Sequence, residues 1–352
     1  MRAAVLEEYG EPLAVKEVDD PELEPHGVVA EIDSVGVCRT DWHAWQGHWD
    51  WIGLKPETPH VLGHEPVGTV VEVGEDVETV EVGQQIAIPF NLGCGHCRMC
   101  RTGHENICEN QRILGFSEDT PGTFAEKVHV PDADVNAVPL PDVIDPDTAA
   151  GIGCRFMTSY HGLAHRADVG RGEDVVIYGL GGVGLSGVQI ADALGANVVG
   201  VDLMDEKLDK AEELGAVATV NAADTDPVAE VRDITDGGAA VSVDALGIAE
   251  TTKNAVASLA KNGRHVQLGL TTDEESGEIS LPVDVMVAQE LDFCGSLGLQ
   301  PSHYPEMLSM IETGKLDPSE MVAETISLDE IPETLDAMSD FDTLGIPVCN
   351  EF

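Results

Sequence analysis

The sequence predicts an α/β plus β chain, in which a β-rich part is followed by a parallel sheet with helices. Residues 1 to about 150 contain short runs of β-branched residues separated by Gly and Pro, with little helical periodicity. From about residue 155, short apolar runs alternate with segments of helical spacing, which is the repeating unit of a parallel sheet. After about residue 295 the pattern is mixed again, and 352 residues are enough for two domains.

The expected elements follow the chain in that order. In the first part, strands are expected at 28–33, 67–74, 84–89 and 125–130. In the second part, a strand at 174–179, a helix at 183–195 and a strand at 197–202 form one unit, and the pattern continues through 209–216, 241–247, 251–263 and 265–270.

The charge balance is strongly acidic. There are 65 Asp and Glu against 18 Lys and Arg, a net charge of −47, spread along the whole chain. Nucleic acid and anionic membrane surfaces are excluded as partners, because both need clustered basic residues. Self-repulsion of this size is screened at high salt, which indicates adaptation to the salt-rich cytoplasm of halophilic archaea. No signal peptide and no run long enough for a membrane span is found, so a cytoplasmic protein is expected.

A glycine-rich turn follows the apolar run at 174–179. Gly179, Gly181 and Gly184 stand in the order G-x-G-x-x-G, between a strand and a helix. The first glycine turns the chain, the second lets a pyrophosphate approach the backbone, and the third lets helix and strand pack closely. Asp202, 18 residues after Gly184, can accept hydrogen bonds from ribose hydroxyls and repels a 2′-phosphate, which favours NAD over NADP. The alternative is a tight turn that binds no ligand.

Four of the eight cysteines lie in one short stretch with the spacing C-x2-C-x2-C-x7-C; they are Cys94, Cys97, Cys100 and Cys108. Four thiolates on one loop suit a structural zinc ion with no open position. An iron–sulfur cluster is the alternative, although ferredoxin runs usually have Pro after the fourth cysteine and here Glu109 follows.

Three further residues that bind metals are far apart in the sequence. Cys38, His64 and Cys154 together offer two thiolates and one imidazole, which suits a catalytic zinc ion with an open fourth position. Taken singly, each is equally consistent with a buried core residue. Cys294 and Cys349 have no partner pattern and are expected to be buried or partly buried thiols.

With these motifs the chain resembles the zinc-dependent alcohol dehydrogenases of the medium-chain dehydrogenase/reductase family. "GHEPVGTVVEVG" at 63–74 matches the zinc signature of that family, and the cysteine stretch, "GCRFMTSYHG" and "GLGGVG" occur in its order. The resemblance covers essentially the whole chain. It implies a GroES-like catalytic domain at 1–153 with a zinc lobe at 93–109, an inserted Rossmann NAD-binding domain at 154–293, and a return to the catalytic domain at 294–352.

The resemblance also implies roles in catalysis. Cys38, His64 and Cys154 would hold the catalytic zinc, with Asp41 orienting His64. Glu65 would be a nearby carboxylate or a transient ligand. The resemblance places the proton relay at Thr40 and at His43, the latter at the surface.

For the cofactor, the resemblance places Arg39 at the pyrophosphate, Thr158 and Val183 at the nicotinamide, and Lys207 beside Asp202 at the adenosine ribose. The full set of expected cofactor-binding residues is Arg39, Thr158, Gly179, Gly181, Gly182, Val183, Gly184, Asp202 and Lys207.

The implied reaction is reversible hydride transfer between a primary or secondary alcohol and NAD, in a homodimer or homotetramer that carries two zinc ions per chain. A polyol or sugar dehydrogenase of the same family is the alternative, although its members usually have a carboxylate where Cys154 stands. Two other possibilities are an interaction module built on the zinc lobe and a zinc-free relative of the quinone reductases.

All four tryptophans lie between residues 42 and 51. We expect Trp42 and Trp45 to pack beneath this loop, and Trp49 and Trp51 to line the substrate channel with Phe90. Plain packing of the tryptophans is the alternative.

Overall fold

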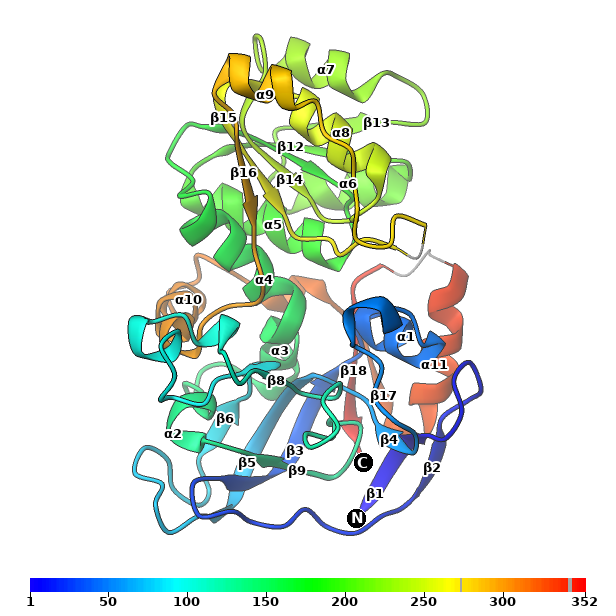
Figure 1. Ribbon diagram of the computed structural model, residues 1–352, viewed down its shortest axis with the longest axis vertical. Helices are drawn as coiled ribbons and strands as arrows, with labels where there is room; N and C mark the ends of the chain where they lie inside the picture. Colours follow the sequence, from blue (N-terminus) through cyan, green and yellow to red (C-terminus); the bar gives the residue numbers. More distant parts are fainter. Residues whose placement is uncertain (273, 341–343) are drawn as a thin grey trace. The chain divides into compact units, whose positions relative to one another are not determined.

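The computed structural model describes residues 1–272, 274–340 and 344–352 and divides the chain into two compact units (Figure 1). Unit 1 comprises Met1–Met157 and Gly298–Phe352, and unit 2 comprises Thr158–Leu297. No helix in the described part of the chain is long and apolar enough to cross a lipid bilayer.

Unit 1 is built on a seven-stranded sheet in the order β10-β6-β5-β3-β18-β17, with β9 also paired to β3. The chain returns to it at the end, because β18 pairs antiparallel with β3. The strands of this sheet are β3 (Val28–Gly36), β5 (Glu65–Val73), β6 (Gln85–Ala87), β9 (Lys127–Val130), β10 (Val138–Pro139), β17 (Val322–Ser327) and β18 (Ile346–Glu351). The strands expected at 28–33, 67–74, 84–89 and 125–130 are therefore present.

Smaller elements complete unit 1. A three-stranded sheet joins β1 (Arg2–Leu6), β2 (Ala14–Glu17) and β4 (His60–Val61), and β7 (Asn91–Leu92) pairs with β8 (Arg112–Ile113). The helices are α1 (Arg39–Gln46), α2 (Ala133–Asn136), α3 (Pro146–Ala150), α10 (Tyr304–Glu312) and α11 (Ile331–Ala337). Short helical turns are η1 (Asp50–Ile52), η2 (Cys100–Thr102), η3 (Glu105–Ile107), η4 (Ile152–Phe156), η6 (Pro301–His303), η7 (Pro318–Met321), η8 (Leu328–Glu330) and η9 (Met338–Asp340). Helix α4 (Met157–Tyr160) contains the boundary between the units.

Unit 2 is a six-stranded sheet in the order β13-β12-β11-β14-β15-β16, and every pairing in it is parallel. Its strands are β11 (Asp174–Tyr178), β12 (Asn197–Asp202), β13 (Ala218–Asn221), β14 (Ala239–Asp244), β15 (Leu259–Gln267) and β16 (Asp292–Gly295). Its helices are α5 (Gly182–Leu194), α6 (Asp205–Glu213), α7 (Pro227–Ile234), α8 (Ala249–Ala257) and α9 (Val283–Gln289), after the turn η5 (His161–Arg166).

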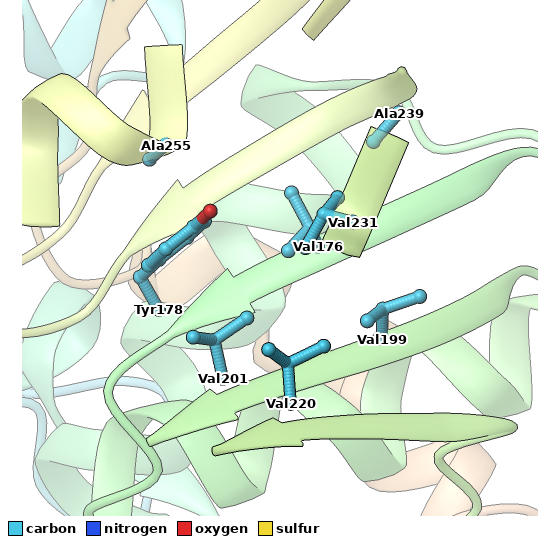
Figure 2. Packing of buried hydrophobic residues seen from close by; sticks show 8 residues of the cluster. All are labelled: Val176, Tyr178, Val199, Val201, Val220, Val231, Ala239 and Ala255. Carbon is cyan, nitrogen blue, oxygen red and sulfur yellow. The ribbon is translucent and has the colours of Figure 1, made fainter. Parts of the chain in front are cut away.

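The core of unit 2 explains its short apolar strands. Side chains of β11, β12, β13 and β14 pack there with one residue each of α7 and α8 (Figure 2). The cluster consists of Val176, Tyr178, Val199, Val201, Val220, Val231, Ala239 and Ala255. Strands buried on both faces of a parallel sheet are expected to be continuously apolar, as the sequence pattern indicates. The buried hydroxyl of Tyr178 is satisfied by Ser258, with 2.6 Å between their oxygen atoms.

One segment differs from its sequence pattern. The apolar spacing at 251–263 continues past the end of α8, which stops at Ala257. Leu259 instead begins β15 and pairs with Ala239 of β14, before a shift in register. Leu259 is fully buried in this position, so pairing within the sheet outweighs helical periodicity there.

Candidate active site

Three segments of unit 1 bring four residues with metal-binding side chains together. Cys38 is the residue before α1, His64 and Glu65 stand at the start of β5, and Cys154 lies in the π-helical turn η4. One ligand atom from each lies within 4.8 Å of the others, and these residues are largely removed from solvent. The antiparallel pairing of Gly36 with Glu65 puts the end of β3 beside the start of β5, which explains how Cys38 and His64 meet.

The orientation of His64 is fixed by Asp41. The Nδ1 atom of His64 lies 2.7 Å from Oδ1 of Asp41, while Oδ2 of Asp41 accepts a hydrogen bond of 2.9 Å from the backbone N–H of Cys38. The carboxylate accepts a hydrogen bond from Nδ1 of His64, so Nε2 is the ring nitrogen left to bind a metal ion. Within the described residues, Nε2 is buried and makes no hydrogen bond. A buried imidazole nitrogen without a hydrogen bond, beside two thiols, fits a metal ion.

Glu65 is fully buried and is held by Arg155, which sequence reasoning missed. Nη2 and Nε of Arg155 donate to the two carboxylate oxygens of Glu65 at 2.7 and 3.2 Å, and Nη2 also donates to the carbonyl of Val37 at 3.0 Å. Burial raises the pKa of Glu65 to about 7, and the guanidinium opposes that shift. The signal in the sequence was an arginine directly after Cys154 in an otherwise uncharged run, since a buried arginine needs a carboxylate partner.

Glycines make room for this carboxylate. A Cβ atom on Gly36 would lie 2.3 Å from Oε2 of Glu65, and one on Gly153 would lie 2.6 Å from its Cβ. Both positions therefore exclude any larger residue while Glu65 keeps this place.

Aromatic rings surround His64. Phe90 and Phe116 both meet its ring edge-on, with centroids 5.9 and 5.7 Å away. Phe90 was expected beside the substrate, whereas Phe116 gave no signal in the sequence. Both side chains are buried, so the surroundings of the cluster include apolar aromatic surface.

The cysteine lobe gathers its four thiols without a disulfide. The Sγ atom of Cys97 lies 3.5 Å from that of Cys100 and 3.7 Å from that of Cys108. Four thiolates about 2.3 Å from a tetrahedral zinc ion stand roughly 3.8 Å apart, so these separations fit that ion. Backbone N–H groups of Cys94 and Asn110 also point at the sulfur of Cys108, at 3.4 and 3.2 Å. Such donors stabilise thiolates rather than thiols.

The glycine-rich turn of unit 2 joins β11 to α5. Gly179 has φ +86°, which favours glycine, and a Cβ on Gly184 would lie 1.8 Å from the carbonyl oxygen of Gly179. These two glycines are required by the fold itself. A Cβ on Gly181, in contrast, would meet nothing within 4 Å, so the bare backbone there serves no contact within the described chain. Gly181 is the residue before α5, where unpaired N–H groups attract phosphate. The turn therefore fits a pyrophosphate.

Asp202 ends β12 next to this turn. Its Oδ2 accepts a hydrogen bond of 2.7 Å from the backbone of Leu180, between the first two glycines, and its Oδ1 accepts one of 2.8 Å from Leu203. The carboxylate thus ties the strand end to the turn. Lys207 is half-buried in α6, and Thr158 is buried in α4. Val183 and Gly182 stand in the first turn of α5, and the carbonyl of Val183 accepts a hydrogen bond of 2.7 Å from the Ser159 hydroxyl.

The expected relay residues and the tryptophans lie on or beside α1. Thr40 is half-buried in the first turn. His43, expected at the surface, is instead half-buried against Trp42 and Trp49, because the chain folds back after α1. Arg39 lies over the ring of Trp42, 4.4 Å from its centroid, and donates to the carbonyl of Met338.

The four tryptophans do not share one environment. Trp42 and Trp45 are buried, as expected, and their indole N–H groups donate to Ser339 and to the carbonyl of Glu11. Trp49 is 5% exposed, whereas Trp51 is 41% exposed on the turn η1.

Comparison with known proteins agrees with this architecture. The family described as "Alcohol dehydrogenase GroES-like domain" matches residues 24–142, and the family described as "Zinc-binding dehydrogenase" matches residues 182–313. An alcohol dehydrogenase of Geobacillus stearothermophilus is 36% identical over 339 residues, which cover 96% of this chain and 95% of that protein. An NAD-dependent alcohol dehydrogenase of Sulfurisphaera tokodaii is 33% identical over 354 residues, covering 98% of both.

Solved structures give the same result. An alcohol dehydrogenase from Thermus sp. ATN1 aligns over 100% of both chains with a TM-score of 0.91 and 29% identity. The alcohol dehydrogenase from Aeropyrum pernix aligns over 99% of this chain and 100% of that one, with a TM-score of 0.88 and 32% identity. The chain belongs to the zinc-dependent medium-chain alcohol dehydrogenase family, with a GroES-like domain and a Rossmann-type domain.

Proposed function

We propose that the protein is a zinc-dependent alcohol dehydrogenase that transfers hydride reversibly between a primary or secondary alcohol and NAD. The observation that carries this proposal is the buried cluster of Cys38, His64 and Cys154, in which Nε2 of His64 has no hydrogen-bond partner among the described residues. When bound, a zinc ion supplies Lewis-acid polarisation of the alcohol oxygen and the nicotinamide supplies the hydride acceptor. The relatives named above as alcohol dehydrogenases support the same assignment.

The residues of the chain prepare this chemistry in unit 1. Cys38, His64 and Cys154 would hold the metal, and Asp41 keeps His64 in the tautomer that can bind it. Arg155 balances the charge of Glu65 and ties it to the segment before Cys38. This ion pair holds the carboxylate beside the metal-binding side chains without adding an uncompensated charge.

The relay and the cofactor residues are assigned with the same proposal. Thr40 and His43 would carry the alcohol proton away from the site, and the lobe of Cys94, Cys97, Cys100 and Cys108 would hold a second, structural zinc ion. The turn at Gly179–Gly184 would hold the pyrophosphate, with Asp202 and Lys207 at the adenosine ribose. Arg39, Thr158 and Val183 would complete the cofactor site. Unit 1 would thus serve as catalytic domain and unit 2 as NAD-binding domain.

The substrate class is proposed from the surroundings of the cluster. Phe90 and Phe116 place apolar rings next to His64, and a thiol rather than a carboxylate occupies position 154. Simple alcohols suit such surroundings better than polyols, whose hydroxyl groups would lose hydrogen bonds there.

The test is the initial rate of NAD reduction in molar KCl with short primary, secondary and aromatic alcohols, with sorbitol, glucose and NADP as controls. Turnover of simple alcohols with NAD is expected. Activity with polyols alone would assign the alternative substrate class, and activity with NADP alone would overturn the role given to Asp202. No turnover of any alcohol by folded, zinc-loaded protein would refute the proposed function.

Salt adaptation is proposed from the charge. A net charge of −47 on this chain is screened only at high ionic strength, which suits a salt-rich cytoplasm of the halophilic type. The free energy of unfolding should rise with KCl concentration, and equal stability in dilute buffer and molar salt would contradict the proposal.

Assembly as a homo-oligomer is proposed from the edge of the unit 2 sheet. Among the described strands, β16 pairs only with β15, and its free edge exposes Phe293. The neighbouring helix α9 buries none of its residues and exposes Val283, Val285 and Val287. A second copy covering this surface would explain both the open edge and the apolar helix. Sedimentation of the wild type and of Val287→Asp tests it, because the variant should dissociate, and a monomeric wild type would refute it.

A further inference from the structure

The end of helix α1 brings two histidines together that are five residues apart. Gly47 has φ +74° and its N–H donates to the carbonyl of Ala44 at 2.9 Å, while the N–H of His48 donates to the carbonyl of His43 at 3.0 Å. This pair of bonds is the glycine-dependent helix ending that turns the chain back over its last turn. As a result, Nδ1 of His48 lies 2.9 Å from Nδ1 of His43.

The two imidazoles are enclosed by the tryptophans of the same segment. Trp49 stacks on His43 with centroids 4.5 Å apart, and Trp42 meets both rings edge-on at 5.0 and 5.3 Å. Trp49 holds this position with φ +65°, a backbone conformation that is unfavourable for a bulky residue. The stacking of Trp49 on His43 is therefore kept in spite of a strained backbone at Trp49.

His43 is poorly suited to keep a proton that it accepts. Burial lowers its pKa to about 4, and the charges of His48 and Arg39 act in the same direction, opposed by Cys38. Helix α11 and the turn η9 pack against α1, and the two carboxylates of α11, Glu333 and Asp336, are exposed. A proton that reaches His43 therefore needs an onward acceptor.

We propose that His48 is the last residue of the proton relay and accepts from His43 the proton released by the alcohol. The inference rests on the proposed function of the site. It explains why a second histidine stands at the helix end, and why tryptophans contact both rings: they hold the two rings in place for transfer.

The step balances without a further reactant. Since the hydrogen bond between the rings joins Nδ1 to Nδ1, His43 accepts the incoming proton at Nε2 and passes its Nδ1 proton to Nδ1 of His48. His48 then releases its Nε2 proton to water or buffer. One proton enters and one leaves, both rings end neutral, and the hydrogen bond between them now runs from His48 to His43. Exchange of the ring protons with water restores the starting tautomers before the next turnover.

The test compares wild type with His48→Asn, whose amide oxygen can accept the bond from His43 but cannot carry a proton onward. His165→Asn is the matched control, because it breaks the other Nδ1–Nδ1 contact, between His161 and His165 at 3.2 Å in unit 2. For His48→Asn we expect kcat of alcohol oxidation to fall about tenfold, less than the roughly 10²–10⁴-fold supplied by a directly acting acid–base group. The loss should deepen at low pH, be restored by added imidazole, and leave the KM for NAD unchanged.

A second readout needs neither a variant nor turnover. The ¹⁵N spectrum of the wild-type histidine rings should show one protonated and one unprotonated Nδ1 in the pair. Two unprotonated Nδ1 atoms would overturn the proposal. So would an active wild type whose kcat, pH profile and response to imidazole are matched by His48→Asn, an outcome that leaves the proposed function standing. A wild type that oxidises no alcohol would refute the proposed function and the relay with it.

Discussion

Replacing either of two glycines of the dinucleotide turn by alanine should have opposite effects on the free energy of unfolding. Gly181 has φ −79° and ψ −166°, which alanine adopts freely, and its Cβ would meet nothing within 4 Å. Gly181→Ala should therefore change the free energy of unfolding by no more than about 1 kcal/mol, in the stabilising direction. The methyl would stand where the pyrophosphate approaches, so NAD affinity should fall at least about tenfold, or roughly 1.4 kcal/mol.

Gly184→Ala should instead damage the fold. Its Cβ would lie 1.8 Å from the carbonyl oxygen of Gly179, where real Cβ atoms essentially never come under 3.0 Å, so helix and strand must separate by more than an ångström. Overpacking of this kind costs about 1–3 kcal/mol, offset in part by the better helix propensity of alanine. Urea unfolding and calorimetric NAD titration in molar KCl measure both quantities. If Gly181→Ala binds NAD as tightly as wild type, the turn does not hold the pyrophosphate and the reasoning is refuted.

Three further predictions concern unit 1. Asp41→Asn should weaken zinc binding at the cluster about 10–100-fold, measured by competition with a chelator, because the orientation of His64 is lost; unchanged affinity would contradict the role of Asp41. Arg155→Met should lower the free energy of unfolding by about 3–5 kcal/mol by leaving Glu65 buried and unpaired, and Glu65→Gln added to it should recover part of the loss; additive losses would count against the ion pair. Burial lowers the pKa of His43 to about 4, so between pH 6.5 and 4 the unfolded chain binds a proton that the folded chain does not. The free energy of unfolding should therefore decrease as the pH is lowered through that window, by about 1–3 kcal/mol more in wild type than in His43→Gln.

The sequence was most informative where the chemistry is local. The turn at Gly179–Gly184, the strand ending at Asp202 and the cysteine lobe each lie within one short stretch, so their spacing alone predicts what they form. Cys38, His64 and Cys154 could be grouped by their side-chain chemistry and by the resemblance to a family but not by spacing, since only the pairing of β3 with β5 and the turn η4 bring them together.

Other parts of the site depend on packing that spacing does not encode. Arg155 reaches Glu65 across 90 residues, and Phe116 meets His64 only through the tertiary fold. His48 could have been predicted, because a glycine directly after α1 brings the residues on either side of the turn into contact. The start of β15 at Leu259 was not predicted, because pairing with β14 inside the sheet outweighs the helical spacing of the sequence there.

The most direct measurement is the zinc content per chain, together with alcohol oxidation, in wild type, His64→Ala and Cys100→Ser. The account predicts two zinc ions in wild type and one in each variant. His64→Ala should remain folded and lose activity, whereas Cys100→Ser should lose stability first. Two zinc ions in His64→Ala, or full activity with one, would contradict the claim that the buried cluster of Cys38, His64 and Cys154 is the catalytic zinc site.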